Sequence, residues 1–428
     1  MLLKKIYELP QPVVDFIRLT GRLGDEKGVN VYVVGGFVRD LFLGVDNFDM
    51  DLVVEGDGIA FAQELAHRLT LRLVAHKRFG TATLLGLEGL KVDIASARKE
   101  IYETPAALPV VSSGQIEDDL FRRDFTINAM AVSLNAHNFG KVVDFYGGQS
   151  DLKSGIVRAL HPLSFIDDPT RILRAVRFEQ RFDFKIEKKT LAWIRGAVRR
   201  QMLHRVQKHR LRDEIVLIFR EKIPFKSVRR LSQICGFSYI WPRLRFQKKW
   251  AAAFEEVNRK SLWFKEWFPH KRHLEPYVMY MCLFFYPLSV KEIRKAVLAY
   301  AFHKRESLRI LSLRENFQGV RRELLKKNIK PSSVYRALDP LTYEVILLIS
   351  ILAPYPRLIQ RVENFLFVYN GQRLHVRGED LKKLGIKPGP AYKKILQDLL
   401  YAKVDGKVRT KEQELEFLRT LAKPGWVP

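Results

Sequence analysis

The sequence has little cysteine and no long apolar run. Only Cys235 and Cys282 occur among the 428 residues, far apart and in apolar surroundings. This pattern excludes a disulfide framework and a cysteine-based metal site. The first residues lack the apolar core of a signal peptide. The apolar runs at 279–286 and 345–353 are too short to cross a bilayer. We therefore expect a cytoplasmic protein with no membrane contact.

Two widespread nucleotide-binding signatures are also missing. The chain contains neither G-x-x-x-x-G-K-[ST] nor G-x-G-x-x-G, which argues against P-loop and Rossmann chemistry. Internal repeats and low-complexity tracts are absent as well. The 47% of hydrophobic residues is enough to build the cores of two or three domains.

Charge is distributed unevenly along the chain. Residues 1–150 carry 16 basic and 20 acidic side chains, whereas residues 151–428 carry 58 basic and 27 acidic ones. Excess charge that only maintained solubility would not require such a division. A strongly basic C-terminal part instead indicates a polyanionic partner, such as a nucleic acid.

The pattern of apolar residues predicts an α+β protein, with a mixed sheet first and helices afterwards. Strands are expected at 31–34, 49–54, 81–85 and 91–95, with a further element starting at 128–132. Helices are expected at 37–43 and 60–69, and the pattern becomes helical from about residue 167. Turn residues at 369–371 and 377–378 mark a boundary before a last helical piece, 371–428.

The first chemical signature is Gly35-Gly36 after a strand, followed by Arg39-Asp40 and then by Asp49 and Asp51. Paired glycines let backbone N–H groups approach a phosphate, and the helix that begins there points its positive end at the same place. Asp49 and Asp51 are two apart on a strand, so their side chains project together. Such a pair can hold Mg²⁺ against a triphosphate. Exposed strands also carry alternating acids, but the combination with the glycine element is more specific.

Other charged residues have two interpretations each when judged by residue type. Arg122 and Arg123 suit the clamping of phosphate oxygens, or form a solvated charge cluster. Asn128 bonds either a ribose hydroxyl or a core backbone group. Asp168 precedes Pro169 and is suited to capping a helix, the role that residue chemistry alone favours. On a helix Asp168 and Arg171 would share a face.

Taken in order, these motifs resemble the DNA polymerase β superfamily and, more narrowly, class II tRNA nucleotidyltransferases and bacterial poly(A) polymerases. The resemblance covers roughly residues 30–220. It rests on segments 35–51, 122–129, 144–152 and 167–178, with a weaker fifth motif at 210–214. It implies a catalytic head at 1–150, a base-recognising neck at 151–220, a tRNA-binding body at 221–370 and a tRNA-binding tail at 371–428.

The resemblance also implies roles for individual residues. Asp49 and Asp51 would be catalytic and would hold two Mg²⁺ ions. Asp168 and Arg171 would pair with the base, selecting C or A; the usual Glu of that motif is Asp167 here. The residues implied in nucleotide binding are Gly35, Gly36, Arg39, Arg123, Asp124, Asn128, Asp168, Arg171, Arg174 and Arg177.

Some assignments stay open at this point. Arg174 and Arg177 would hold the triphosphate or form ion pairs in the neck. Asp93 is either a third metal-site carboxylate or part of an ion pair at a strand end. Residues 98–117 lack periodicity and predict a functional loop between catalytic elements. In the tail, Lys387 and Gly389 form either a phosphate seat before a helix or an ordinary helix start.

The expected function is the addition of C, A or both, from CTP and ATP, to the 3′ end of tRNA. The partners would be the acceptor and TΨC arms of tRNA, recognised by shape and 2′-hydroxyls; no DNA partner is expected. One alternative is poly(A) polymerase activity on other RNAs, against which we note the lack of a long basic C-terminal extension. The other is a non-catalytic RNA-binding protein. The sequence leaves open which of the CCA nucleotides are added.

Overall fold

A computed structural model describes residues 2–76, 80–87, 89–106, 109–384, 386 and 389–421. The chain divides into two compact units, Met1–Pro242 and Arg243–Pro428. The four-part division into head, neck, body and tail stays a prediction.

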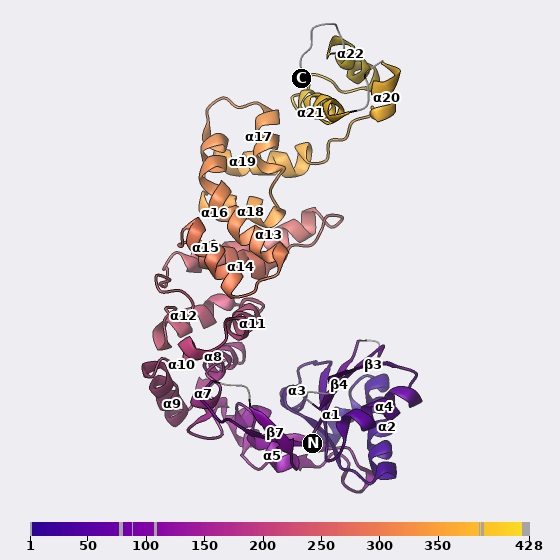
Figure 1. The fold of residues 1–428 in the computed structure, drawn as a ribbon, viewed down its shortest axis with the longest axis vertical. Coiled ribbons are helices and arrows are strands. Elements are labelled where there is room, and N and C mark those ends of the chain that lie inside the picture. Colours follow the sequence, from indigo (N-terminus) through magenta and orange to yellow (C-terminus); the bar gives the residue numbers. More distant parts are fainter. Residues whose placement is uncertain are drawn as a thin grey trace. The chain divides into compact units, whose positions relative to one another are not determined.

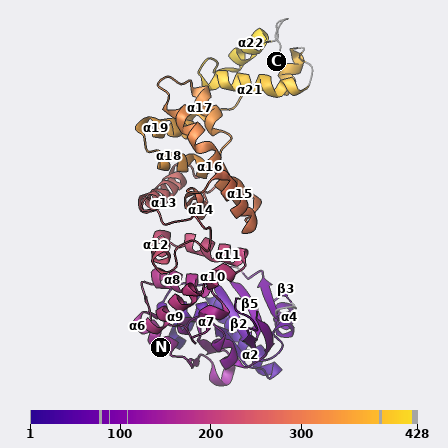
Figure 2. The same ribbon diagram turned by 60° about the vertical axis from the view of Figure 1, so that its left-hand side comes forward.

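A seven-stranded mixed sheet forms the framework of the first unit (Figure 1). Its order is β3-β4-β5-β2-β1-β8-β9. The central strand β2 pairs antiparallel with β1 and parallel with β5, and Figure 2 shows β2 and β5 side by side. The strands are β1 (Val31–Val34), β2 (Asp49–Val54), β3 (Arg72–His76), β4 (Thr81–Leu85), β5 (Lys91–Ser96), β8 (Ala131–Ser133) and β9 (Val142–Val143).

Helices pack on this sheet because the strands contribute fully buried aliphatic residues. Val31, Val34 and Met50 have no exposed surface. Helix α4 packs on β4 and β5, and Asp57 caps it by accepting from the amides of Ile59 and Ala60. The helices of this part are α1 (Leu2–Tyr7), α2 (Gln11–Lys27), α3 (Gly36–Leu43), α4 (Gly58–Arg68) and α5 (Ile116–Phe121), with a 3₁₀ turn η2 (Thr126–Asn128).

The segment predicted as a loop is largely ordered secondary structure, so that prediction was wrong. Residues 98–113 contain an antiparallel hairpin of β6 (Arg98–Ile101) and β7 (Val110–Ser113). The chain then forms α5. Because β7 is exposed along its length, it lacks the alternation of apolar and polar residues that reveals a half-buried strand in a sequence.

The rest of the first unit is helical, as predicted, apart from one short parallel pair of strands. That pair joins β10 (Ile156–Val157) and β11 (Lys185–Ile186). The helices are α6 (Gly148–Ser154), α7 (Ser164–Asp167), α8 (Arg171–Arg181), α9 (Lys188–Arg199), α10 (Met202–Arg205), α11 (Lys208–Phe219) and α12 (Pro224–Ile234).

In its described residues the second unit is built of helices. Its elements are α13 (Trp250–Trp267), α14 (Pro276–Phe285), α15 (Val290–Ala299), α16 (Lys304–Leu325), α17 (Pro331–Leu338), α18 (Tyr343–Leu352), α19 (Pro356–Asn364), a π-helical turn η4 (Phe365–Tyr369), α20 (Gly378–Lys383), α21 (Pro390–Val404) and α22 (Lys411–Leu421). Helices α20 to α22 share their own apolar cluster, which includes Leu381, Leu399 and Leu418. The expected α+β class, a sheet followed by helices, is confirmed.

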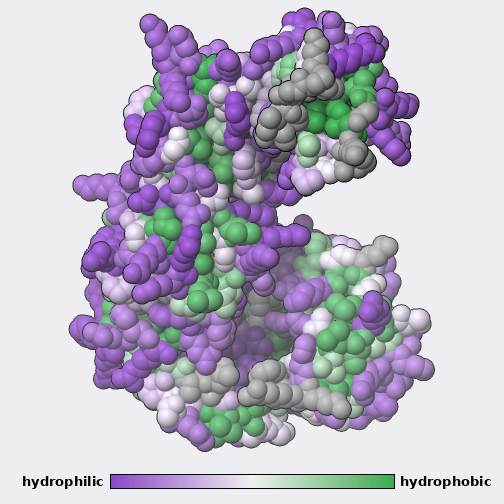
Figure 3. All heavy atoms as spheres, turned by 45° about the horizontal axis from the view of Figure 1, so that its top comes forward, coloured by the Kyte–Doolittle hydropathy of each residue, from purple (hydrophilic) through white to green (hydrophobic). Residues whose placement is uncertain are grey.

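The surface is mostly hydrophilic, and the two cysteines lie wholly or partly inside the protein. Hydrophilic residues cover most of the face shown in Figure 3. Cys282 is buried and Cys235 is partly buried, and burial raises the pKa of the Cys235 thiol to about 12. Within the described part of the chain, no helix combines the length and apolar character needed to cross a membrane.

Candidate active site

One polar cavity of the first unit brings together most of the residues singled out in the sequence. Its volume is about 650 Å³. Asp49 and Asp51 line it, and so do Asp168 and Arg171, more than a hundred positions later in the chain. The other predicted residues in its wall are Gly36, Arg39, Arg123, Asp124, Asn128, Arg174 and Arg177.

The two carboxylates on β2 are adjacent but differ in environment. Asp49 is exposed, and its Oδ1 lies 3.0 Å from Lys91 Nζ. Asp51 is less exposed, and burial raises the pKa of its carboxyl, as do Asp49 and Asp93, while Arg123 and Lys91 oppose the rise. Crowded carboxylates of this kind form a site whose excess negative charge a divalent cation would relieve.

Asp93 lies opposite Asp51 in the parallel pairing of β2 with β5. Its carboxylate accepts from Thr83 Oγ1 and from Lys91 Nζ, the latter at 2.7 Å. Burial opposes ionisation of Asp93, but these two hydrogen bonds outweigh it and lower the pKa. Among the described residues no cluster of three or more acidic, His or Cys side chains is arranged to share a metal. Lys91 forms ion pairs with both Asp49 and Asp93, and the assignment of metal ligands among the three carboxylates stays a prediction.

Gly35 begins the turn from β1 into α3, and its conformation explains why glycine is needed there. Its φ is 74° and ψ is −132°, a region that side chains disfavour. A Cβ at this position would lie 2.5 Å from Arg123 Nη1 and 3.6 Å from Asp51 Oδ2. The Arg123 Nε is buried and has no hydrogen-bond partner. The glycine turn therefore leaves room for a guanidinium with a free donor beside the carboxylate pair.

Arg39 is held in place by its neighbours. Its Nε and Nη2 donate to the two oxygens of Asp40 at 2.8 and 2.9 Å, and its Nη1 donates to Asn128 Oδ1 at 2.6 Å. The guanidinium also lies over the rings of Phe178 and Phe182. Asn128 in turn donates to Asp124. Asn128, which was predicted to bind the nucleotide, thereby links Arg39 to Asp124.

Asp124 and Arg174 form a buried ion pair between the sheet part and helix α8. Arg174 donates to Asp124 Oδ2 from Nε at 2.8 Å and from Nη2 at 2.7 Å. Burial opposes the charge on Asp124, but Arg174 and Asn128 outweigh it and lower its pKa to about 2. Arg174 and Arg177 also approach Glu214. The predicted ion pairs of the neck are therefore present, and both arginines face the cavity as well.

The geometry predicted for Asp168 and Arg171 needs correction. Helix α8 begins at Arg171, and Asp168 precedes it with extended backbone (φ −133°, ψ 94°), because a residue before proline disfavours helical backbone. Asp168 Oδ1 accepts from the amide and hydroxyl of Thr170, the N-cap residue of α8, so the carboxylate closes a turn ahead of the helix rather than capping its first turn. Its Oδ2 accepts from Arg210 Nη2 at 2.8 Å. Both side chains still line the same cavity.

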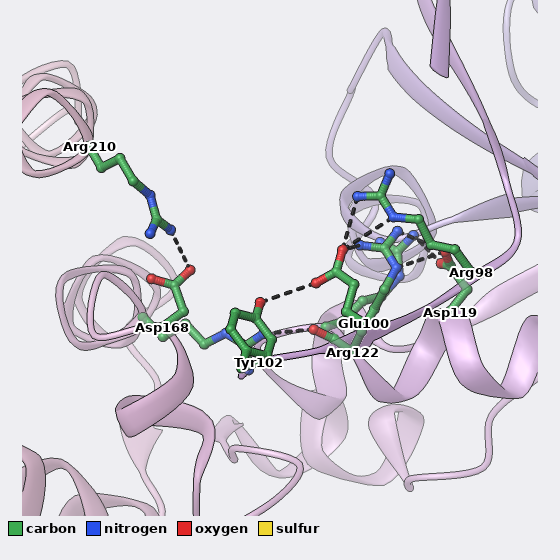
Figure 4. A network of polar contacts seen from close by, with 9 residues as sticks. Arg98, Glu100, Tyr102, Asp119, Arg122, Asp168 and Arg210 are labelled. Carbon is green, nitrogen blue, oxygen red and sulfur yellow. Dashed lines mark hydrogen bonds and ion pairs between the residues drawn. The ribbon is translucent and has the colours of Figure 1, made fainter. Parts of the chain in front are cut away.

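Four participants were not assigned a role from the sequence: Glu100, Tyr102, Asp119 and Arg210 (Figure 4). Asp119 lies three and four residues before Arg122 and Arg123 and pairs with both, a helical spacing that could have identified it. Burial and Glu100 raise the pKa of Tyr102 to about 12. Glu100 and Tyr102 are neighbours in the chain, and they offered no signal because only the tertiary fold brings Glu100 to Arg122.

The predicted phosphate seat in the tail is only partly described. Lys387 lies outside the described residues. Gly389 is exposed and precedes α21 with extended backbone (φ 172°). No other atom lies within 4 Å of the position of a Cβ there.

The mixed sheet, the glycine turn and the paired carboxylates define a nucleotidyltransferase head of the polymerase β type. Comparison with family models agrees, since residues 31–158 match the poly A polymerase head domain. Residues 183–246 match a probable RNA and SrmB-binding site of polymerase A.

Relatives extend the similarity over the whole chain. An A-adding tRNA nucleotidyltransferase of Halalkalibacterium halodurans is 31% identical over 95% of this chain and 92% of its own length. One from Geobacter sulfurreducens is 38% identical over 97% of this chain, which spans only 48% of that longer protein. The structure of a CCA-adding enzyme in apo form II is 36% identical, with a TM-score of 0.80 and 97% coverage of both chains. The chain belongs to the tRNA nucleotidyltransferase and poly(A) polymerase family.

A glycine comparison tests the strained turn. Gly35→Ala should lower the free energy of unfolding by about 1–3 kcal/mol, because the strained backbone remains and Arg123 must move. Gly28→Ala is the matched control: its φ is 64°, but its added Cβ meets no atom within 4 Å. Urea unfolding measures both variants, and an equal loss in the two would contradict a special role for the Gly35 turn.

The Asp124–Arg174 pair predicts a pH dependence of stability. The folded pKa of about 2 is below the ordinary 3.8, so ionised Asp124 contributes about 2 kcal/mol above pH 4. This contribution disappears as the pH falls through 4 towards 2. Asp124→Asn should therefore be less stable than the parent at pH 7. The difference in unfolding free energy between the two proteins should become smaller between pH 4 and pH 2. A difference independent of pH in unfolding curves would refute the assignment.

Proposed function

We propose that this protein transfers a nucleotide from ATP to the 3′-hydroxyl of tRNA. A second candidate activity uses CTP as well as ATP. One observation carries the proposal: a single cavity holds both the Asp49–Asp51 pair and the Asp168–Arg171 pair. The first pair suits phosphoryl chemistry, and the second suits recognition of a base. A protein that reads the base with its own side chains needs no nucleic-acid template.

The β2 carboxylates would hold Mg²⁺, which neutralises charge on the triphosphate when bound. The protein's own contribution is positional. The glycine turn and Arg123, which lines the cavity, would receive phosphate oxygens. Asp49 and Asp51, which line the same cavity, would hold the metal beside the triphosphate.

Asp168 and Arg171 retain the capacity to bind a base even though both have partners. Each carboxylate oxygen can accept more than one hydrogen bond, so Asp168 can still accept from the exocyclic amine of A or C. Arg171 uses one donor each for Ser164 Oγ and the Arg122 carbonyl oxygen, both at 2.7 Å. Since guanidinium has five donors, others are left for ring nitrogen or carbonyl acceptors. U and G present a carbonyl where Asp168 needs a donor.

The names of the relatives favour addition of the terminal A. Three proteins named A-adding tRNA nucleotidyltransferase are similar over 84% to 97% of this chain. Two CC-adding ones are similar over only 39% and 40% of it. Complexes of related CCA-adding enzymes with ATP, CTP and tRNA support these substrates. Addition of the whole CCA end is the second candidate, because the Asp168–Arg171 pair accepts C as well as A.

The charge of the second unit supports tRNA as the partner. Residues 243–428 carry 37 basic and 18 acidic side chains. Such a surface binds the phosphates of a folded RNA with an affinity that falls as salt rises.

Asp51→Ala should abolish nucleotide incorporation into tRNA while leaving tRNA affinity and the melting temperature nearly unchanged. Loss of a metal ligand removes several kcal/mol of transition-state stabilisation. The assay is Mg²⁺-dependent incorporation of labelled nucleotide, with the exposed Asp15→Ala on α2 as control. Retention of more than about a tenth of the parent rate, which is only about 1.4 kcal/mol, would rule out Asp51 as a ligand.

Asp168→Ala should alter the choice of nucleotide. The substitution removes the acceptor for the exocyclic amine, so UTP and GTP should gain relative to ATP and CTP by roughly 1–3 kcal/mol. It also removes the turn with Thr170, which should cost about 1 kcal/mol of stability. Rates with all four nucleotides on one tRNA primer, beside a melting curve, distinguish the two roles. Lower stability with unchanged nucleotide preference would leave Asp168 with only its role in this turn.

A further inference from the structure

Asp119 is a buried carboxylate behind two arginines of the cavity wall, Arg122 and Arg123, and the proposed chemistry assigns no role to it. It lies on α5, and its side chain has no exposed surface. Its Oδ1 accepts from Arg122 Nε at 2.9 Å and Nη2 at 2.7 Å, and its Oδ2 accepts from Arg123 Nη2 at 3.0 Å. Both guanidinium groups outweigh the effect of burial and lower the pKa of Asp119. One carboxylate thus holds two consecutive arginines.

The Arg122 side of this contact leads to the base-reading pair. With its guanidinium held by Asp119, Arg122 presents its backbone carbonyl to Arg171 Nη2 at 2.7 Å. Arg171 is itself 5% exposed. Its orientation therefore depends on where the backbone of Arg122 lies.

The Arg123 side leads to the opposite end of the cavity. Arg123 lies against Gly35 and near Asp51. Its Nη2 is occupied by Asp119 and its Nε is free. The contact with Asp119 thus fixes the orientation of the Arg123 guanidinium, whose Nη1 lies beside Gly35.

Glu100 anchors only one of the two arginines. Its Oε1 accepts from Arg122 Nη1 at 3.1 Å and from Arg98 Nη2 at 3.0 Å, and Tyr102 donates to its Oε2 at 3.1 Å (Figure 4). None of the contacts of Arg123 given by the structure involves Glu100. The two buried carboxylates can therefore be tested separately.

We propose that Asp119 is the positioning residue that joins base selection by Arg171 to triphosphate binding by Arg123. Glu100 supports the base-selecting side alone. The inference rests on the proposed function, since it concerns nucleotide binding in the same cavity.

The experiment compares Asp119→Asn, Glu100→Gln and a control, Glu117→Gln, an exposed neighbour on α5. Two probes are used on the full chain: binding of inorganic tripolyphosphate, and kcat and KM for ATP and GTP on a tRNA primer. Loss of one charged hydrogen bond corresponds to about a tenfold change or more. Asp119→Asn should weaken tripolyphosphate about tenfold and lower the preference for ATP over GTP about tenfold. Glu100→Gln should lower the preference and leave tripolyphosphate affinity unchanged, and Glu117→Gln should change neither.

If Asp119 had a purely structural role, Asp119→Asn would lower the melting temperature and leave both the tripolyphosphate affinity and the preference for ATP over GTP unchanged. That result would overturn the proposal. So would an equal loss of tripolyphosphate affinity in Glu100→Gln. If Asp119→Asn does not fold, Asp119→Glu, which keeps the charge but displaces both guanidinium groups, is measured with the same two probes, and unchanged tripolyphosphate affinity and nucleotide preference would overturn the proposal. If the parent protein shows no preference among nucleotides, the proposed function fails; if the parent discriminates and the Asp119 variant does so equally, only this inference fails.

Discussion

The buried ion pair between Asp124 and Arg174 is the interaction on which the site depends. Asp124 follows α5, next to the sheet, and Arg174 belongs to α8, fifty positions later. Their contact holds together the two walls of the cavity that carry the Asp49–Asp51 pair and the Asp168–Arg171 pair. Since a charge without its partner in such a place is costly, the two walls are coupled in stability as well as in position.

Around this pair, arginines and carboxylates form an almost continuous network. Asp119 takes two arginines, Glu214 approaches two more, and Asp168 takes Arg210. Few of these groups are free to rearrange, which favours a site shaped before substrate arrives. The buried Nε of Arg123 is an exception, since it has no hydrogen-bond partner.

The sequence predicts those parts of the fold and site that depend on local patterns. The strand 31–34 follows from a run of β-branched and aromatic residues and the strand 49–54 from alternation, and both agree residue for residue. The β6–β7 hairpin was missed because an exposed ribbon has no buried face to reveal it. The place of Asp168 was misjudged because Pro169 delays the start of α8. Glu100 and Tyr102 could not be found, since the contact that joins them to the site, from Arg122 to Glu100, is made by the fold.

The most direct measurement of the central claim uses a tRNA primer that ends in CC, offered each of the four nucleotides separately with Mg²⁺. The claim is that protein side chains alone choose the nucleotide in the cavity that also performs the transfer. It predicts extension by a single residue with ATP and little or none with UTP or GTP. Equal extension with all four nucleotides, or none with ATP, would contradict it.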